Sequence, residues 1–157
     1  RMKRRHLRQD VIDFCEKVRG LRSDVTFGAD IIAGFPTETD EMAENTLRLV
    51  DECGLIYLHV FPYSSRPGTP AARMPQVAKD IRKERAGALR DAGEIQLNNF
   101  LKSRIGLIEN VLVEKENTGH TEHFAPVLLD RVIEPGTIAK AKVIGLEDGK
   151  LKAELAG

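Results

Sequence analysis

Residues 25–61 read VTFGADIIAGFPTETDEMAENTLRLVDECGLIYLHVF, and this stretch decides the fold of the first half of the chain. Its beginning, Val25 to Ala33, is rich in β-forming residues, and its near-continuous apolar end predicts a strand buried on both faces. Leu55 to Phe61 repeats this pattern. Between them, an amphipathic helix is expected from Thr37 or Thr39 to about Cys53, with acidic residues at its start. This order predicts a βαβ unit with two parallel strands.

Two more helices and a loop are expected around this unit. Apolar residues at three- and four-residue spacing predict a helix from about Gln9 to Arg19, which Gly20 would end. Four prolines between residues 62 and 75 predict a loop. A long apolar stripe from about Val77 to Arg104 predicts a helix of roughly 40 Å, long enough to connect two domains.

After Gly106 the apolar residues alternate, which predicts β-strands separated by turns. The expected strands are Glu109 to Lys115, Thr121 to Leu129, Thr137 to Ile144 and Leu151 to Leu155. This spacing predicts a small barrel or sandwich of about 50 residues. We therefore expect an α/β protein with a first domain over 1–76, a connecting helix over 77–104 and an all-β domain over 105–157.

Two parallel strands alone leave apolar surface uncovered. We therefore expect the first half to be part of a larger sheet whose earlier strands lie outside this chain. The alternative is that helices alone cover the pair. An unfilled sheet edge would also allow two copies of the chain to pair.

Composition restricts the class of protein. The chain is 41% hydrophobic and 31% charged, which is ordinary for a soluble globular protein, and it has neither a membrane-spanning run nor a signal-peptide pattern. Its two cysteines, Cys15 and Cys53, are too few for a disulfide framework or a four-thiolate metal site. The four histidines show no metal-ligand spacing, so no bound metal is expected. A reducing, cytoplasmic setting is the expectation.

The net charge is zero, yet the charges are segregated along the chain. Residues 1–20 carry seven basic against three acidic residues, and residues 66–104 carry nine against four. One interpretation of this segregation is that the charges lie on solvent-exposed helix faces. The alternative is that the two basic stretches flank a site for an anionic partner.

Two strand ends carry groups that suit a ligand. Gly34 follows the first strand, where a glycine lets a ligand approach the backbone and free helix N–H groups favour an anion. Turns of this kind are also common between strands and helices where no ligand binds. Arg66 follows the second strand. Its guanidinium can form two parallel hydrogen bonds to a carboxylate or phosphate of a ligand, or an ordinary ion pair with an acidic residue on the surface.

Together these segments resemble the methylthiotransferases of the radical S-adenosylmethionine superfamily. The matching stretches are Met2 to His6, Asp30 to Glu38, His59 to Pro75 and, in a tail similar to the TRAM domain, Glu114 to Val127. The form His-Val-Phe-Pro-Tyr-Ser is most similar to the branch that methylthiolates threonylcarbamoyladenosine beside the tRNA anticodon. Branches that act on isopentenyladenosine or on a ribosomal protein resemble it less.

The resemblance implies the C-terminal part of a partial (β/α) radical SAM barrel, followed by a TRAM barrel. Family members use S-adenosylmethionine and two [4Fe–4S] clusters, one of them on a Cys-x-x-x-Cys-x-x-Cys loop. This chain lacks that motif. It is therefore expected to bind neither cluster, to contain no catalytic residue, and to be inactive without the missing N-terminal domains.

The resemblance also assigns binding residues. Those implied for S-adenosylmethionine are Asp30, Ile32, Gly34, Glu38, Val60, Phe61 and Arg66. Those implied for the tRNA anticodon stem-loop are Arg4, Arg5, Thr121, Glu122, Lys140 and Lys142. Thr37 stands where the family usually has glycine. Because residues 105–157 are net acidic, weak RNA binding is expected.

Two other classes of protein remain open. A non-enzymatic RNA-binding adaptor would share the TRAM barrel, but its gene would encode no cluster cysteines upstream. An α/β nucleotide-binding protein would use the turn at Gly34, which a nucleotide titration would test.

Overall fold

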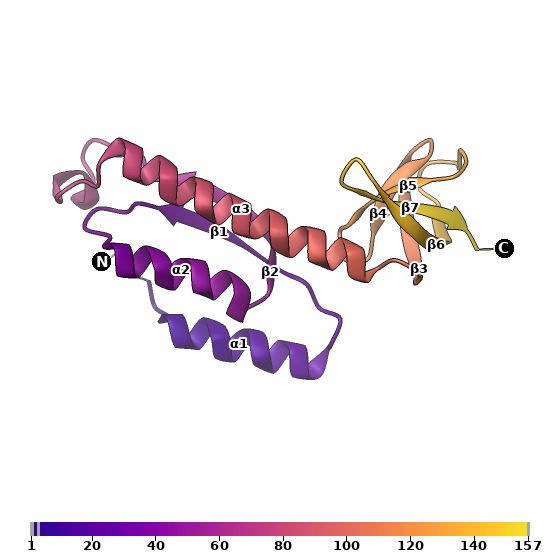
Figure 1. Ribbon diagram of the computed structural model, residues 1–157, viewed down its shortest axis with the longest axis horizontal. Helices are drawn as coiled ribbons and strands as arrows, with labels where there is room; N and C mark the ends of the chain where they lie inside the picture. The colour runs from indigo at the N-terminus through magenta and orange to yellow at the C-terminus, as the bar shows by residue number, and fades with distance from the viewer. Residues whose placement is uncertain (1, 3, 157) are drawn as a thin grey trace. The chain divides into compact units, whose positions relative to one another are not determined.

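The computed structural model describes residues 2 and 4–156, so Lys3 of the basic Met2-to-His6 stretch lies outside the description. The first part comprises α1 (Arg8–Leu21), β1 (Phe27–Ala33), α2 (Asp40–Glu52), β2 (Leu55–Pro62), the 3-10 helix η1 (Pro70–Arg73) and α3 (Lys79–Ser103) (Figure 1). The strands that follow are β3 (Ile108–Lys115), β4 (Thr118–Thr121), β5 (Pro126–Leu129), β6 (Ile138–Glu147) and β7 (Lys150–Leu155). The chain divides into two compact units, Arg1–Gln96 and Leu97–Gly157. No helix among the described residues is both long and apolar enough to cross a bilayer.

The first unit contains the predicted βαβ arrangement. β1 and β2 pair in parallel, with Ile31 opposite Val60 and Ile32 opposite Phe61. One face of this pair packs against α1, α2 and the first part of α3. The buried residues of this core are Ile12, Cys15, Ala33, Val50, Cys53, Leu55, Val60, Ala86 and Leu89.

The expectation that both strands are buried on both faces is wrong for this chain. Exposure alternates along β1, so that Gly28, Asp30 and Ile32 lie on an open face. The helices cover mainly the other face, although Ile32 also borders a cavity with residues of α2 and α3. For the same reason, helices alone do not enclose the pair.

Helix ends depend on local hydrogen bonds. Thr39, not Thr37, caps α2, because its Oγ1 accepts from the Met42 N–H at 3.3 Å. Gly20 does not end α1 as expected. The helix runs on to Leu21, since the Arg22 N–H still donates to the Val18 carbonyl at 2.9 Å.

The second unit confirms the predicted barrel. Its strands close in the order β3-β4-β5-β7-β6 around a core that includes Leu101 from the last turns of α3. The single strand expected from Thr121 to Leu129 is instead two strands, β4 and β5, separated by a turn. Phe124 in this turn has a left-handed φ of 64°, which interrupts the extended backbone of a strand.

A buried charge cluster lies between the end of α3 and the barrel. Glu109 is 3% exposed, and its Oε1 accepts from the Arg104 Nε at 2.6 Å. Its other oxygen lies 3.7 Å from the Nδ1 of His123, which is also buried. A buried carboxylate needs such partners. The cluster therefore ties the turn that contains His123 to the first strand of the barrel.

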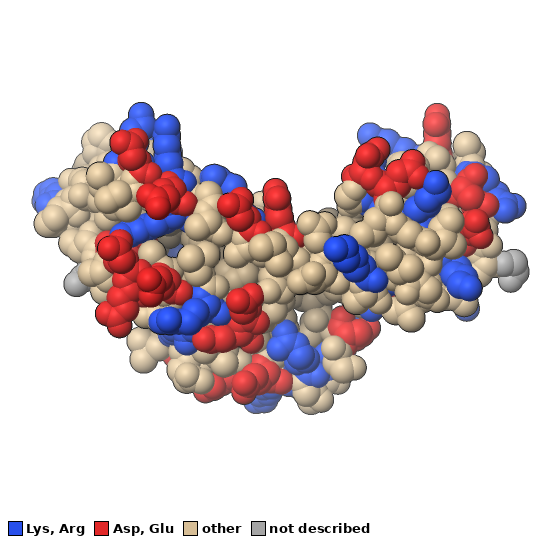
Figure 2. Space-filling view, viewed as in Figure 1, with Lys and Arg blue, Asp and Glu red and all other residues tan. Residues whose placement is uncertain are grey.

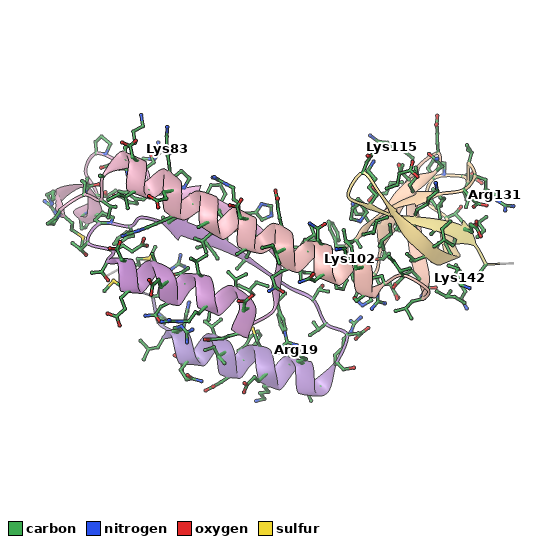
Figure 3. All side chains as sticks on the ribbon, viewed as in Figure 1. Arg19, Lys83, Lys102, Lys115, Arg131 and Lys142 are labelled. Atoms are coloured by element: carbon green, nitrogen blue, oxygen red, sulfur yellow. The ribbon has the colours of Figure 1, made fainter. Side chains whose placement is uncertain are left out.

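Cys15 and Cys53 are buried together in the first core. Desolvation, followed by a hydrogen bond with the Cys15 thiol, raises the pKa of Cys53 from 9.0 to about 11. Arg19 of α1 lies beside the two cysteines, and its guanidinium donates to the Cys53 carbonyl at 2.8 Å (Figure 3). The Cys53 thiol is therefore shielded from solvent and protonated at neutral pH.

A pH-dependent loss of stability follows from this thiol. The unfolded chain releases the Cys53 proton near pH 9.0, whereas the folded chain keeps it to about pH 11. Because the unfolded state binds fewer protons in this window, its population rises with pH. Thermal unfolding measured across the window should show a falling midpoint. Cys53→Ala should flatten this dependence, and an unchanged slope in that variant would contradict the assignment.

Candidate cofactor and nucleic-acid sites

The open face of β1 and β2 brings together three of the residues expected to contact the cofactor. Asp30 lies opposite His59, and Ile32 lies opposite Phe61, so all four side chains share one face. Ile32 is 40% exposed and Phe61 is 54% exposed, near the carboxyl ends of both strands. An exposed aromatic ring beside an aliphatic side chain suits a flat base such as adenine.

Val60 is separated from this group. Its side chain lies on the opposite face, is 8% exposed and belongs to the core. Its carbonyl accepts from the Arg90 Nη2 at 3.1 Å. Neighbouring residues of a strand point to opposite faces, so Val60 and Phe61 do not share a ligand-facing surface.

Gly34 is buried, and its surroundings explain why it is glycine. It has a left-handed φ of 72°, and a Cβ there would lie 2.3 Å from the Cγ of Arg82 on α3. Its N–H donates to the Oε1 of Glu38 at 3.0 Å. The space and the donor that the sequence suggested for a ligand are thus used within the protein.

Thr37 occupies a strained position in the same turn. Its φ is 68°, in the region that favours glycine. Its N–H donates to the Pro75 carbonyl at 3.1 Å, which fixes the turn against the proline-rich loop. The strain explains physically why glycine suits this position better.

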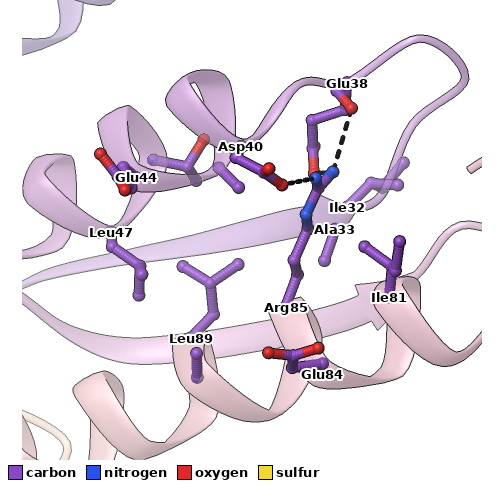
Figure 4. A pocket seen from close by; sticks show the side chains of 13 residues that line it. Ile32, Ala33, Glu38, Asp40, Glu44, Leu47, Ile81, Glu84, Arg85 and Leu89 are labelled. Atoms are coloured by element: carbon purple, nitrogen blue, oxygen red, sulfur yellow. Dashed lines mark hydrogen bonds and ion pairs between the residues drawn. The ribbon is translucent and has the colours of Figure 1, made fainter.

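Glu38 holds the turn through an ion pair, drawn in Figure 4. Its Oε1 lies 2.8 Å from the Nη1 of Arg85, whose Nη2 lies 2.6 Å from an Asp40 oxygen. The side chains of Arg85 and Glu38 are only 12% and 14% exposed. Desolvation lowers the pKa of Arg85, but the hydrogen bonds to Asp40 and Glu38 outweigh it, so the net pKa is raised.

A cavity of about 330 Å³ lies beside this ion pair. Its apolar side is formed by Ile32, Leu47, Ile81 and Leu89, and its polar side by Arg85 with its carboxylates. Glu38 contributes to the wall of the cavity with an oxygen that already accepts two hydrogen bonds. In the structure, Glu38 therefore positions the turn after β1.

Arg4 lies close to β1. A hollow of about 560 Å³ follows this strand and is lined by Arg4 and His6 together with residues 27–32 and residues of α1 and α2. Arg4 is thus placed beside Asp30 and Ile32, whereas Arg5 is exposed and does not line this hollow. Arg66 is exposed in the loop after β2, where its carbonyl accepts from the Thr69 hydroxyl at 2.8 Å.

The barrel separates its expected RNA-binding residues into two kinds. Thr121 is buried, and its Oγ1 accepts from the N–H groups of His123 and Ala125, both at 3.2 Å. It therefore shapes the turn. Glu122, Lys140 and Lys142 are exposed, and the two lysines occupy alternate outward positions of β6.

Sequence reasoning did not single out the aromatic pair beside this turn. The rings of His120 and Phe124 stack with centroids 5.1 Å apart and an interplanar angle of 29°. Gly119 and the polar residues that follow it indicated a turn. The reversal of chain direction in that turn, however, depends on contacts that the periodicity of the sequence does not record.

Charge is mixed on the surface that Figure 2 shows. Acidic and basic side chains alternate over each unit on this face, without a large patch of one sign. The segregation along the sequence is therefore dispersed here by folding, as expected for solvated helix faces. This face offers no extended basic tract for nucleic acid.

The described residues do not fit an iron–sulfur cluster. No group of three or more His, Cys, Asp and Glu residues is placed to hold a metal ion within the described chain. Its two cysteines are both buried in the core, where Cys53 hydrogen-bonds with Cys15. No reaction step can therefore be assigned to cluster ligands of this chain.

The chain is similar in sequence to known proteins, although no protein-family model matches it. It is 59% identical over 155 residues to the threonylcarbamoyladenosine tRNA methylthiotransferase MtaB of Rickettsia prowazekii, covering 99% of this chain and 37% of that protein. It is 33% identical over 162 residues to the tRNA-2-methylthio-N(6)-dimethylallyladenosine synthase of Bartonella bacilliformis, covering 99% and 35%. The chain thus spans little more than a third of the length of these relatives.

Proposed function

Because this chain belongs to the radical S-adenosylmethionine methylthiotransferases, we propose that it is the C-terminal part of a tRNA-modifying enzyme. The reaction proposed for the complete protein is methylthiolation of threonylcarbamoyladenosine at adenine C2, next to the anticodon. The 59% identity to an enzyme named for this nucleoside carries the choice of branch, compared with 33% for a dimethylallyladenosine synthase. The proposed setting is the cytoplasm, where tRNA is modified.

The open strand face supports a role in holding S-adenosylmethionine. Ile32 and Phe61 would pack against the adenine, and Asp30 on the same face can accept from a ribose hydroxyl or an amino group. The cofactor supplies the radical chemistry and the methyl group. Glu38 and Gly34 act indirectly here, by fixing the turn after β1. The cluster ligands are assigned to the part of the protein that lies outside this chain.

Basic side chains support contact with tRNA. Arg4 beside the strand face and Arg66 after β2 are exposed and suit phosphate groups, as do Lys140 and Lys142 on the barrel. The net acidic barrel keeps this affinity weak and dependent on salt. The open edge of the β1-β2 sheet in the isolated chain can also pair with a second copy, which sedimentation would detect.

The tRNA of a strain that lacks the parent gene tests the proposed function. Threonylcarbamoyladenosine should persist there without its 2-methylthio group, whereas 2-methylthio-isopentenyladenosine should remain as an internal control. Mass spectrometry of digested tRNA measures both. The complete gene should restore the modification, but the 157-residue chain should not, because it lacks cluster ligands. An unchanged modification pattern in the deletion strain would rule out this substrate.

A further inference from the structure

Phe124 is held in a conformation that is costly for an aromatic residue. Its φ of 64° lies in the left-handed region, and its side chain is 72% exposed. Burial of the ring therefore does not compensate for the backbone strain. Strain of this kind persists only where the surrounding structure enforces it, and it concentrates at functional sites.

Four hydrogen bonds enforce this turn. The Thr121 Oγ1 accepts from the N–H groups of His123 and Ala125 at 3.2 Å. In the backbone, the Phe124 N–H donates to the Thr121 carbonyl at 2.9 Å, and the Thr121 N–H donates to the Ala125 carbonyl at 2.9 Å. The turn is thus rigid, and it presents the phenyl ring in a defined orientation.

One side of the ring is supported and the rest is open. His120 stacks against Phe124 at 5.1 Å, and its Nδ1 lies 3.0 Å from a Glu114 oxygen, which holds the imidazole in place. With 72% of Phe124 exposed, a second flat group can stack on the free side. An aromatic ring backed by another ring is a preformed stacking platform.

The surface beside this platform is apolar and then basic. Across the strands, His120 lies opposite Leu112, which lies opposite Ile138, and the last two are 46% and 71% exposed. The next outward positions of β6 are Lys140 and Lys142, and Lys142 is seen to project from the barrel in Figure 3. Strand geometry places Lys140 about 10 Å across and about 7 Å along the sheet from His120.

We propose that Phe124 and His120 form a stacking platform for an unpaired base of tRNA, with Lys140 and Lys142 holding adjacent phosphates. This inference rests on the proposed function. Stacking rings beside lysines are the combination that binds single-stranded nucleic acid without sequence readout. The exposed Glu122 in the turn repels a phosphate but can accept from base amino groups, so this end of the surface favours a base.

The test compares the chain with its Phe124→Asn variant. Asparagine tolerates a left-handed φ but removes the ring, so the melting temperature should stay equal or rise. The affinity for a fluorescent anticodon stem-loop RNA, measured by anisotropy, should fall roughly 5- to 150-fold. The salt dependence should not change, because no phosphate contact is lost. Lys140→Ala should instead lower the slope of that dependence.

Val132→Ala is the matched control, since Val132 is also 71% exposed on the barrel but lies outside this surface. Its affinity for the RNA should equal that of the unmodified chain. Unchanged affinity in Phe124→Asn, or no binding of the RNA by the unmodified chain, would overturn the platform. Altered sedimentation in Phe124→Asn at constant RNA affinity would also overturn it, in favour of a protein contact. The deletion-strain tRNA decides the proposed function separately from all of these outcomes.

Discussion

Gly119→Ala is expected to destabilise the barrel by about 3 kcal/mol, at the upper end of overpacking costs. A Cβ at Gly119 would lie 2.0 Å from the carbonyl oxygen of Leu112 and 2.8 Å from its carbonyl carbon. Both atoms belong to the backbone of β3, which pairs with β4 at this point, with Gly119 opposite Val113. A flexible side chain could yield, but a paired strand cannot without losing its ladder.

The barrel has little reserve to absorb this loss. A unit of this size supplies only a few kcal/mol of net stability, so the variant should be largely unfolded under mild conditions. Gly145→Ala on β6 is the control, because no atom lies within 4 Å of its Cβ position. Its effect should stay within about 0.5 kcal/mol. Urea unfolding followed by circular dichroism measures both, and equal stabilities would show that β3 and β4 pair differently.

Arg85→Met should destabilise the first unit by about 3 kcal/mol, because it leaves a nearly buried carboxylate without its cation. Methionine keeps much of the length and apolar contact of arginine, so the change isolates the charge. Arg85 donates to Glu38 at 2.8 Å and to Asp40 at 2.6 Å. Glu38 would keep only the Gly34 N–H, and the turn after β1 would loosen.

Two comparisons separate this ion pair from general effects on α3. Lys83→Met, on the same helix but exposed to solvent (Figure 3), should change the unfolding free energy by less than about 0.5 kcal/mol. Adding Glu38→Gln to Arg85→Met should recover part of the loss, because no unpaired charge then remains buried. Strictly additive losses in the double variant, measured by urea unfolding, would show that the two side chains do not interact.

The order and type of the elements followed from short-range patterns. Apolar periodicity identified the βαβ unit, the long helix from about Val77 and the change to strands after Gly106, because each pattern involves residues close in sequence. Helix ends were predicted less well, as Gly20 shows, since competing local hydrogen bonds decide them. The resemblance likewise depended on contiguous motifs, and the identity with known methylthiotransferases supports it.

The candidate sites were predicted as residue types but not as surfaces. Asp30, Ile32 and Phe61 do share one face, as strand alternation in a parallel register requires. Val60 faces the core instead, because adjacent residues of a strand cannot both point to a ligand on one face.

The amino-acid sequence by itself determined the type and order of most helices and strands, and the resemblance to the methylthiotransferases. Only the tertiary structure decided that Gly34 accommodates Arg82, that Glu38 is held by Arg85, and that Phe124 is presented on a rigid turn. The physical reason is distance along the chain: periodicity records what neighbouring residues require of the backbone. Contacts between α3 and the turn after β1 join residues more than forty positions apart, and local patterns carry no trace of them.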